Sequence, residues 1–215
     1  MNLNKYIEHT LLKQDATKAE ITKLLDEAIQ YDFLGVCVNP CNVKYAKEYL
    51  KNSDVKVVTV IGFPLGQNTK EIKILETIDA IKNGADEIDM VINVGLLKDK
   101  AYEAIVDEIS AIKGACQGHN LKVILETDLL TQDEIKKACE LCIKAKADLV
   151  KTSTGFVKNG VGAKAEDVAL MFNTVKDAGM QVKASGGIRD KEAALKMIEA
   201  GAVRLGTSSG VKIVS

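Results

Sequence analysis

The sequence predicts an α/β fold, a (β/α)8 TIM barrel that forms a single domain over residues 1–215 and ends in a stunted last helix. Eight short apolar runs alternate with amphipathic stretches, with about 28 residues from one run to the next, the size of a strand plus its crossover helix. The runs are apolar on both faces, as in a parallel sheet that helices cover. No G-x-G-x-x-G motif follows the first run, which disfavours an open dinucleotide-binding sheet.

The predicted strands follow the apolar runs in order. They are residues 7–11, 34–38, 55–61, 87–92, 121–126, 149–151, 181–184 and 203–205. The first run is the least regular, because Glu8, His9 and Thr10 place polar side chains in it. Only residues 208–215 follow the last run, so little chain is left for the eighth helix.

The intervals between the strands carry helix signals. A capping box of Thr17 and Glu20 precedes an apolar stripe over residues 21–29. A second capping box, Thr131 with Glu134, precedes residues 135–145. Three further apolar faces are expected: Ile74, Leu75, Ile78 and Ile81; Val168, Phe172 and Val175; and residues 193–200, between the N-cap Asp190 and Gly201.

The composition excludes several classes of function. Lys and Arg number 29 against 30 Asp and Glu, and aromatic residues are 4%, so neither nucleic acid nor an anionic membrane is expected as a partner. No apolar run approaches the ~18 residues of a membrane span, and no secretory signal follows Met1. The five cysteines are interpreted as reduced thiols of a cytoplasmic protein. Two histidines exclude a His-rich metal site, and we expect neither a metal nor a cofactor.

Charged residues in the apolar runs mark the candidate active site, because a barrel places its site at the carboxyl ends of its strands. Asp89 lies in the fourth run and Glu126 ends the fifth. Lys151 and Lys183 lie inside the sixth and seventh runs, and each is followed two residues later by Ser. Since these strands are consecutive, we expect the two lysines to be neighbours.

Two interpretations of these lysines stay open at this point. In the first, each ammonium merely pairs with Asp89 or Glu126, because a buried charge is costly without a partner. In the second, two close ammonium groups disfavour each other's charged form, one pKa falls, and a neutral lysine attacks a carbonyl to form a Schiff base. Asp89 would then move protons nearby.

Glycines and serines that end the last two strands indicate a phosphate site. One group includes Gly186 and Gly187, and the other includes Gly206, Ser208 and Ser209. Barrels often bind phosphate in the loops after strands seven and eight, where glycine lets backbone N–H groups approach the anion. Either motif alone is more typical of a tight turn, but their joint position favours phosphate binding.

With these residues in view, the chain resembles the deoxyribose-phosphate aldolases, a family of class I aldolases. The most specific strings are Lys-Thr-Ser-Thr-Gly-Phe at 151–156 and Lys-Ala-Ser-Gly-Gly-Ile-Arg at 183–189. Further matching strings span almost the whole chain, at residues 8–12, 36–40, 60–66, 87–93, 122–127 and 205–210.

The resemblance implies a role for each candidate catalytic residue. Lys151 would form the imine, Lys183 would be its activating neighbour and proton-transfer partner, and Asp89 would belong to the proton relay. The implied reaction is the reversible cleavage of 2-deoxy-D-ribose 5-phosphate to acetaldehyde and D-glyceraldehyde 3-phosphate in deoxyribonucleoside breakdown. The implied ligand is therefore a small phosphorylated sugar, and no metal is needed because an iminium polarises the substrate. A homodimer is a candidate assembly.

Three features depart from the family pattern. Glu8 stands where the family usually has Asp, and we assign it no role. Family members often continue into a flexible tail that ends in Tyr, whereas this sequence stops at Ser215. The loop over residues 157–163 is slightly longer than usual, which is expected to alter the rim of the pocket. None of the three touches Lys151, Lys183 or Asp89.

Two other functions stay open from the residues alone. One is another phosphosugar barrel enzyme, such as an epimerase or a transaldolase-like enzyme, which would share the phosphate loops without needing two strand lysines. The other is a barrel that binds a phosphosugar without catalysis. Acetaldehyde release separates the first from an aldolase, and binding without turnover would identify the second.

Overall fold

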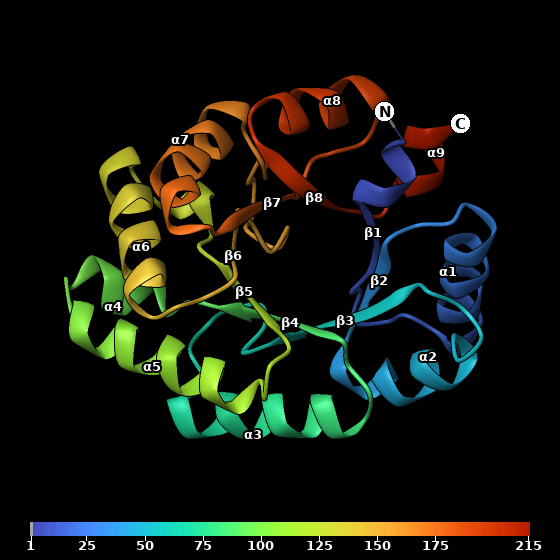
Figure 1. The fold of residues 1–215 in the computed structure, drawn as a ribbon, viewed down its shortest axis with the longest axis horizontal. Coiled ribbons are helices and arrows are strands. Elements are labelled where there is room, and N and C mark those ends of the chain that lie inside the picture. Colours follow the sequence, from blue (N-terminus) through green and yellow to red (C-terminus); the bar gives the residue numbers. More distant parts are fainter. Residues whose placement is uncertain (1) are drawn as a thin grey trace.

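A computed structural model describes residues 2–215, and the eight strands form a closed parallel barrel in the order β1 to β8, with β8 paired to β1. Figure 1 shows the helices as an outer ring around this barrel. The (β/α)8 barrel expected from the sequence is confirmed. The last helix, α9 (Gly210–Val214), has five residues, as the short remaining chain requires.

The strands lie close to their predicted positions. They are β1 (Ile7–Leu11), β2 (Gly35–Val38), β3 (Lys56–Ile61), β4 (Glu87–Val91), β5 (Asn120–Ile124), β6 (Leu149–Lys151), β7 (Gln181–Ser185) and β8 (Ala202–Thr207). The fifth strand is the exception that matters, because it ends at Ile124 and not at Glu126. Glu126 has a φ of 61°, a left-handed conformation that cannot continue a strand.

The remaining helices lie in the intervals between the strands. The α-helices are α1 (Lys18–Gln30), α2 (Val43–Tyr49), α3 (Lys70–Lys82), α4 (Val94–Lys98), α5 (Tyr102–Ala115), α6 (Gln132–Lys144), α7 (Ala165–Val175) and α8 (Lys191–Glu199). Short 3₁₀ turns are η1 (Leu3–Tyr6), η2 (Pro40–Asn42), η3 (Thr127–Leu129) and η4 (Lys176–Ala178).

Helix starts follow the capping chemistry of the sequence. Both capping boxes form, at Thr17 with Glu20 and at Thr131 with Glu134. The side chain of Asp190 accepts a hydrogen bond from the Ala193 N–H and so caps α8. By contrast, α5 begins after Ala101, which has no side chain that could cap a helix, and no such signal marks this helix in the sequence.

The buried face of α3 differs from the predicted one. Leu75 is 60% exposed and Ile78 is also exposed, while Lys73, Thr77 and Ala80 face inward. The reason is an ion pair that crosses to another helix: the Lys73 ammonium is 2.9 Å from a carboxylate oxygen of Glu108 in α5. Ile74 and Ile81 are half-buried and pack against the core, so the predicted face is buried in part, and Lys73 shares the inward face with them.

Lys73 reaches its partner through a gap that glycine provides. Its ammonium also donates to the Val91 carbonyl at 3.0 Å. A Cβ at Gly62, whose φ is +59°, would lie 2.7 Å from the Lys73 stem. Gly62 therefore serves two needs, since it adopts a left-handed conformation and leaves room for the lysine.

One smaller difference concerns α1, where Ile21, Leu24, Leu25 and Ala28 are buried as predicted but Ile29 is 45% exposed.

Most of the apolar core lies between the barrel wall and the helices. Within residues 2–215, no helix has both the length and the apolar character needed to cross a membrane.

We predict that Lys73→Met lowers the free energy of unfolding by about 3–5 kcal/mol, because Glu108 is then left buried without a cation. Urea unfolding measures this. The double variant Lys73→Met/Glu108→Leu is the matched control and should recover most of the loss. A loss in the single variant below about 1 kcal/mol would show that the buried pair does not orient α3.

Candidate active site

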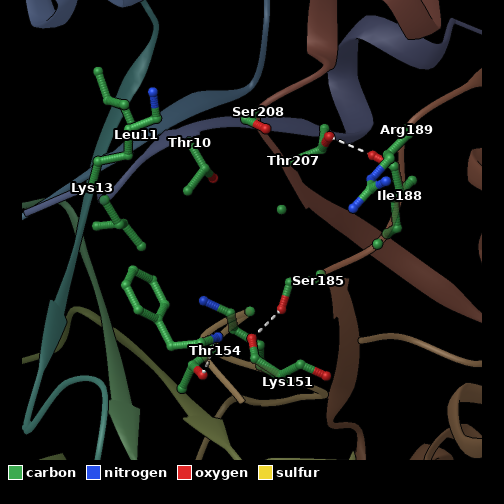
Figure 2. A pocket seen from close by; sticks show the side chains of 17 residues that line it. Thr10, Leu11, Lys13, Lys151, Thr154, Ser185, Ile188, Arg189, Thr207 and Ser208 are labelled. Atoms are coloured by element: carbon green, nitrogen blue, oxygen red, sulfur yellow. Dashed lines mark hydrogen bonds between the residues drawn. The ribbon is translucent and has the colours of Figure 1, made fainter. Parts of the chain in front are cut away.

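A cavity of about 280 Å³ opens at the carboxyl ends of β1, β6, β7 and β8 (Figure 2). Its lining consists of residues 10–13, 151, 153–156, 185–189 and 206–208. These segments belong to the strand ends and the loops that follow them, which is where a barrel of this kind carries its functional residues.

Lys151 on β6 and Lys183 on β7 lie side by side at the base of this region. They are register partners in the paired strands. Both ammonium groups donate to the same oxygen of Asp89 on β4, Oδ2, at 2.8 Å from Lys151 and 2.7 Å from Lys183. Lys151 lines the cavity, whereas Lys183 and Asp89 are fully buried.

This arrangement has a feature of each of the two interpretations of the lysines that the sequence left open. Asp89 is a carboxylate partner, as the first requires, and the two ammonium groups are adjacent, as the second requires. Glu126 has another role: its carboxylate accepts hydrogen bonds from the backbone N–H and the hydroxyl of Thr154. It therefore holds the loop after β6 and does not pair with either lysine.

A third lysine, Lys122 on β5, completes the surroundings of Asp89. Its ammonium is 3.0 Å from Asp89 Oδ1 and 2.6 Å from Glu87 Oε2. Lys122 is the register partner of Asp89 and is fully buried. The sequence analysis did not select it, although a lysine inside a buried strand is the same signal that selected Lys151 and Lys183.

Glu8 on β1 closes the network from the other side. Its carboxylate accepts a hydrogen bond from Lys183, and its second oxygen is 3.5 Å from the Lys122 ammonium and 3.7 Å from Arg204 Nε. The longer side chain of Glu at this position therefore reaches the buried cations.

Three lysines around one carboxylate set the ionisation of the group. Burial alone would raise the pKa of Asp89, but Lys122, Lys151 and Lys183 hold it well below its ordinary value. Burial alone would lower the pKa of Lys183, yet the charges of Asp89 and Glu8 raise it above its ordinary value. Lys183 is thus a lasting cation beside Lys151.

The predicted phosphate residues separate into two groups. Gly186, Gly187, Gly206 and Ser208 line the cavity, while Ser209 lies outside it, in a neighbouring cleft. The chain turns into α9 directly after Ser208, and Ser209 is the residue that precedes this helix.

The loop over residues 157–163 packs against Gly186 and Gly187, two of the glycines predicted to bind phosphate. The Ala163 N–H donates to the Gly186 carbonyl at 3.0 Å, and the Gly162 N–H donates to Asp128 at 2.8 Å. A Cβ at Gly187, whose φ is +74°, would lie 2.3 Å from the Val161 carbonyl oxygen. Glycine at this position therefore allows the loop to lie against the turn that follows β7.

A family model described as DeoC/LacD family aldolase matches residues 4–215 of the chain. The chain belongs to this aldolase family.

Relatives named as aldolases align with this chain over nearly its full length. The deoxyribose-phosphate aldolase of Finegoldia magna is 58% identical over 214 residues, which cover 100% of this chain and 99% of the relative. Deoxyribose-phosphate aldolase 1 of Mesoplasma florum is 56% identical and covers 100% and 96%. The Aeropyrum pernix deoxyribose phosphate aldolase, described as tetrameric, superposes with a TM-score of 0.91 at 36% identity, covering 99% of this chain and 89% of that one.

A second cavity, of about 390 Å³, adjoins the aldolase site. It shares Thr154 and Phe156 with the first cavity, and apolar side chains such as Leu65, Val94 and Leu129 line most of it.

Within residues 2–215, no three His, Cys, Asp or Glu side chains gather as a metal site requires.

The buried charges of the aldolase predict how its stability depends on pH. Burial opposes the ionisation of Glu87, but Lys122 and Lys56 more than offset this and lower the pKa of Glu87 from 4.5 to about 2. A lowered pKa contributes stability above pH 4.5, and this contribution is lost as the pH falls toward about 2. We expect it to be on the order of 3 kcal/mol.

Glu87→Gln should therefore be less stable than the parent protein at neutral pH, and the difference should shrink as the pH falls from 4.5 toward about 2. Urea unfolding at several pH values measures the free energy of unfolding of both proteins. If the two lose stability in parallel over this range, Glu87 does not hold the low pKa.

Proposed function

We propose that this chain is a deoxyribose-phosphate aldolase that reversibly cleaves 2-deoxy-D-ribose 5-phosphate to acetaldehyde and D-glyceraldehyde 3-phosphate through a Schiff base on Lys151. The observation that carries the proposal is the pair of adjacent lysines, Lys151 and Lys183, that both donate to Asp89 Oδ2. Of the two, Lys151 lines a cavity that has no Asp or Glu side chain in its lining. The names of the full-length relatives support the choice of substrate.

Lys151 is the lysine best placed to be the nucleophile. Lys122 and Lys183 are fully buried, whereas Lys151 lines the cavity where a substrate carbonyl can approach. A neutral amine is required for the attack, and Lys183, whose pKa is raised by the charges of Asp89 and Glu8, is not the lysine that supplies it.

The proposed cleavage proceeds through an imine on Lys151. The neutral Lys151 amine adds to C1 of the open-chain aldehyde, and the resulting carbinolamine takes up a proton and loses water to leave a protonated imine. The C2–C3 bond breaks as the C3 hydroxyl loses its proton, and its electron pair moves to the imine to form an enamine. D-Glyceraldehyde 3-phosphate leaves, the enamine takes a proton at C2, and hydrolysis releases acetaldehyde and the free amine.

Asp89 and Lys183 are the groups available to move these protons, together with water. One oxygen of Asp89 contacts both ammonium groups, so a proton that leaves Lys151 has an acceptor at hydrogen-bond distance. Gly186, Gly187, Gly206 and Ser208 would hold the phosphate, and this remote binding would position C1 at Lys151.

A cytoplasmic location and a homodimeric assembly stay predictions from the sequence. All five cysteines are free, as a reducing compartment would keep them. The mass of the protein in solution tests the assembly.

We predict that sodium borohydride together with substrate traps a covalent adduct on Lys151, because only an imine is reduced to a stable amine. Peptide mapping by mass spectrometry locates the adduct. Lys151→Leu should abolish both trapping and turnover while its circular dichroism stays that of the parent protein. An adduct on another lysine, or substantial turnover by Lys151→Leu, would remove Lys151 from the nucleophile role.

We also predict that Lys183→Leu lowers kcat at neutral pH by at least about a hundredfold and shifts the rising limb of the pH–rate profile to higher pH. In this variant the fixed cation beside the attacking amine is missing. Lys183→Arg keeps the charge and should shift the profile less. A profile that keeps its position in Lys183→Leu contradicts the electrostatic role.

A further inference from the structure

Lys13 lies at the edge of the active-site cavity, on the loop that joins β1 to α1. Its side chain is exposed, and the residues after it, up to Thr17, form no helix or strand. Figure 2 shows Lys13 on one side of the cavity and Arg189, from the loop after β7, on the opposite side. Two cations from different loops therefore line opposite sides of the cavity.

The cavity offers no carboxylate to these cations. None of its lining residues is Asp or Glu, and the three charged residues among them are Lys13, Lys151 and Arg189. Within residues 2–215, neither Lys13 nor Arg189 has a carboxylate within 4.0 Å, whereas Lys151 is paired with Asp89. An anion that enters the cavity would thus be the first close negative partner of Lys13 and Arg189.

The position of Lys13 also relates it to a second cleft. This outer cleft shares Thr10, Leu11, Lys13 and Ser208 with the cavity, and it contains Glu20, Glu27 and Lys212. Lys13 therefore stands between the outer cleft and the cavity, on a flexible stem that can turn to either side. A phosphate, with nearly two negative charges, would draw its ammonium toward the cavity.

We propose that Lys13 is a specificity-determining residue that contacts the substrate phosphate from the β1–α1 loop, opposite Arg189 and the Gly186–Gly187 backbone. The inference rests on the proposed function and deepens it, because it assigns to Lys13 the preference for a phosphorylated over an unphosphorylated sugar. The ammonium adds a charge-assisted hydrogen bond that an unphosphorylated sugar cannot accept. Sequence analysis did not select Lys13, because it ends no strand.

The test compares Lys13→Met with the parent protein on 2-deoxyribose 5-phosphate and on 2-deoxyribose. We expect the KM for the phosphorylated sugar to rise about tenfold, with a smaller effect on kcat. The ratio of kcat/KM for the phosphorylated sugar to that for the unphosphorylated one should fall by a similar factor. Lys13→Arg keeps the charge and should retain most of this ratio.

Lys212→Met is the matched control, because Lys212 is exposed and lines the outer cleft but not the cavity. It removes the same charge and should leave the ratio unchanged. An unchanged ratio in Lys13→Met, or an equal fall in Lys212→Met, would overturn the assignment of Lys13.

Inorganic phosphate provides a readout that does not depend on turnover. Titration followed by phosphorus NMR should show about tenfold weaker binding to Lys13→Met than to the parent protein. If the parent protein cleaves neither sugar, the proposed function fails, and this titration still decides the role of Lys13. Equal phosphate affinity of the parent protein and Lys13→Met would overturn the inference even where the aldolase reaction is present.

Discussion

A single buried carboxylate, that of Asp89, organises the chemistry of this barrel. Three lysines from three further strands, Lys122, Lys151 and Lys183, contact its two oxygens. Without it, these ammonium groups would repel one another, and two of them, Lys122 and Lys183, are fully buried. The strand order and register place them there, since Lys122 pairs with Asp89 and Lys151 pairs with Lys183 across neighbouring strands. The closed barrel is therefore what makes one carboxylate common to all three cations.

The three lysines around Asp89 differ in whether they can be reached from the cavity. Lys183 and Lys122 are buried among carboxylates, so both have raised pKa values and act as fixed cations. Lys151 differs because it reaches the cavity, where a carbonyl can meet it. Lys183, one of these fixed cations, lies next to the accessible amine. Asp89 and its three lysines thus neutralise one another's charges inside the barrel, and one of them, Lys151, is also the proposed nucleophile.

The sequence predicted the barrel because its apolar runs recur at strand-plus-helix spacing, and it located Lys151 and Lys183 because charges stand out in such runs. Other features depend on contacts between distant residues. The inward face of α3 depends on Lys73 meeting Glu108, which lies 35 residues away. The left-handed turn at Glu126 depends on its contact with Thr154, and the place of Lys13 depends on the path of a loop. No local periodicity carries that information.

The most direct test of the account is a crystal structure of the protein soaked with 2-deoxyribose 5-phosphate. The account predicts continuous density from Lys151 Nζ to C1 of the sugar, with the phosphate at Gly186 and Gly187. Continuous density from a different lysine would contradict it. So would an unbound sugar whose carbonyl carbon lies far from Lys151 while the phosphate occupies another loop.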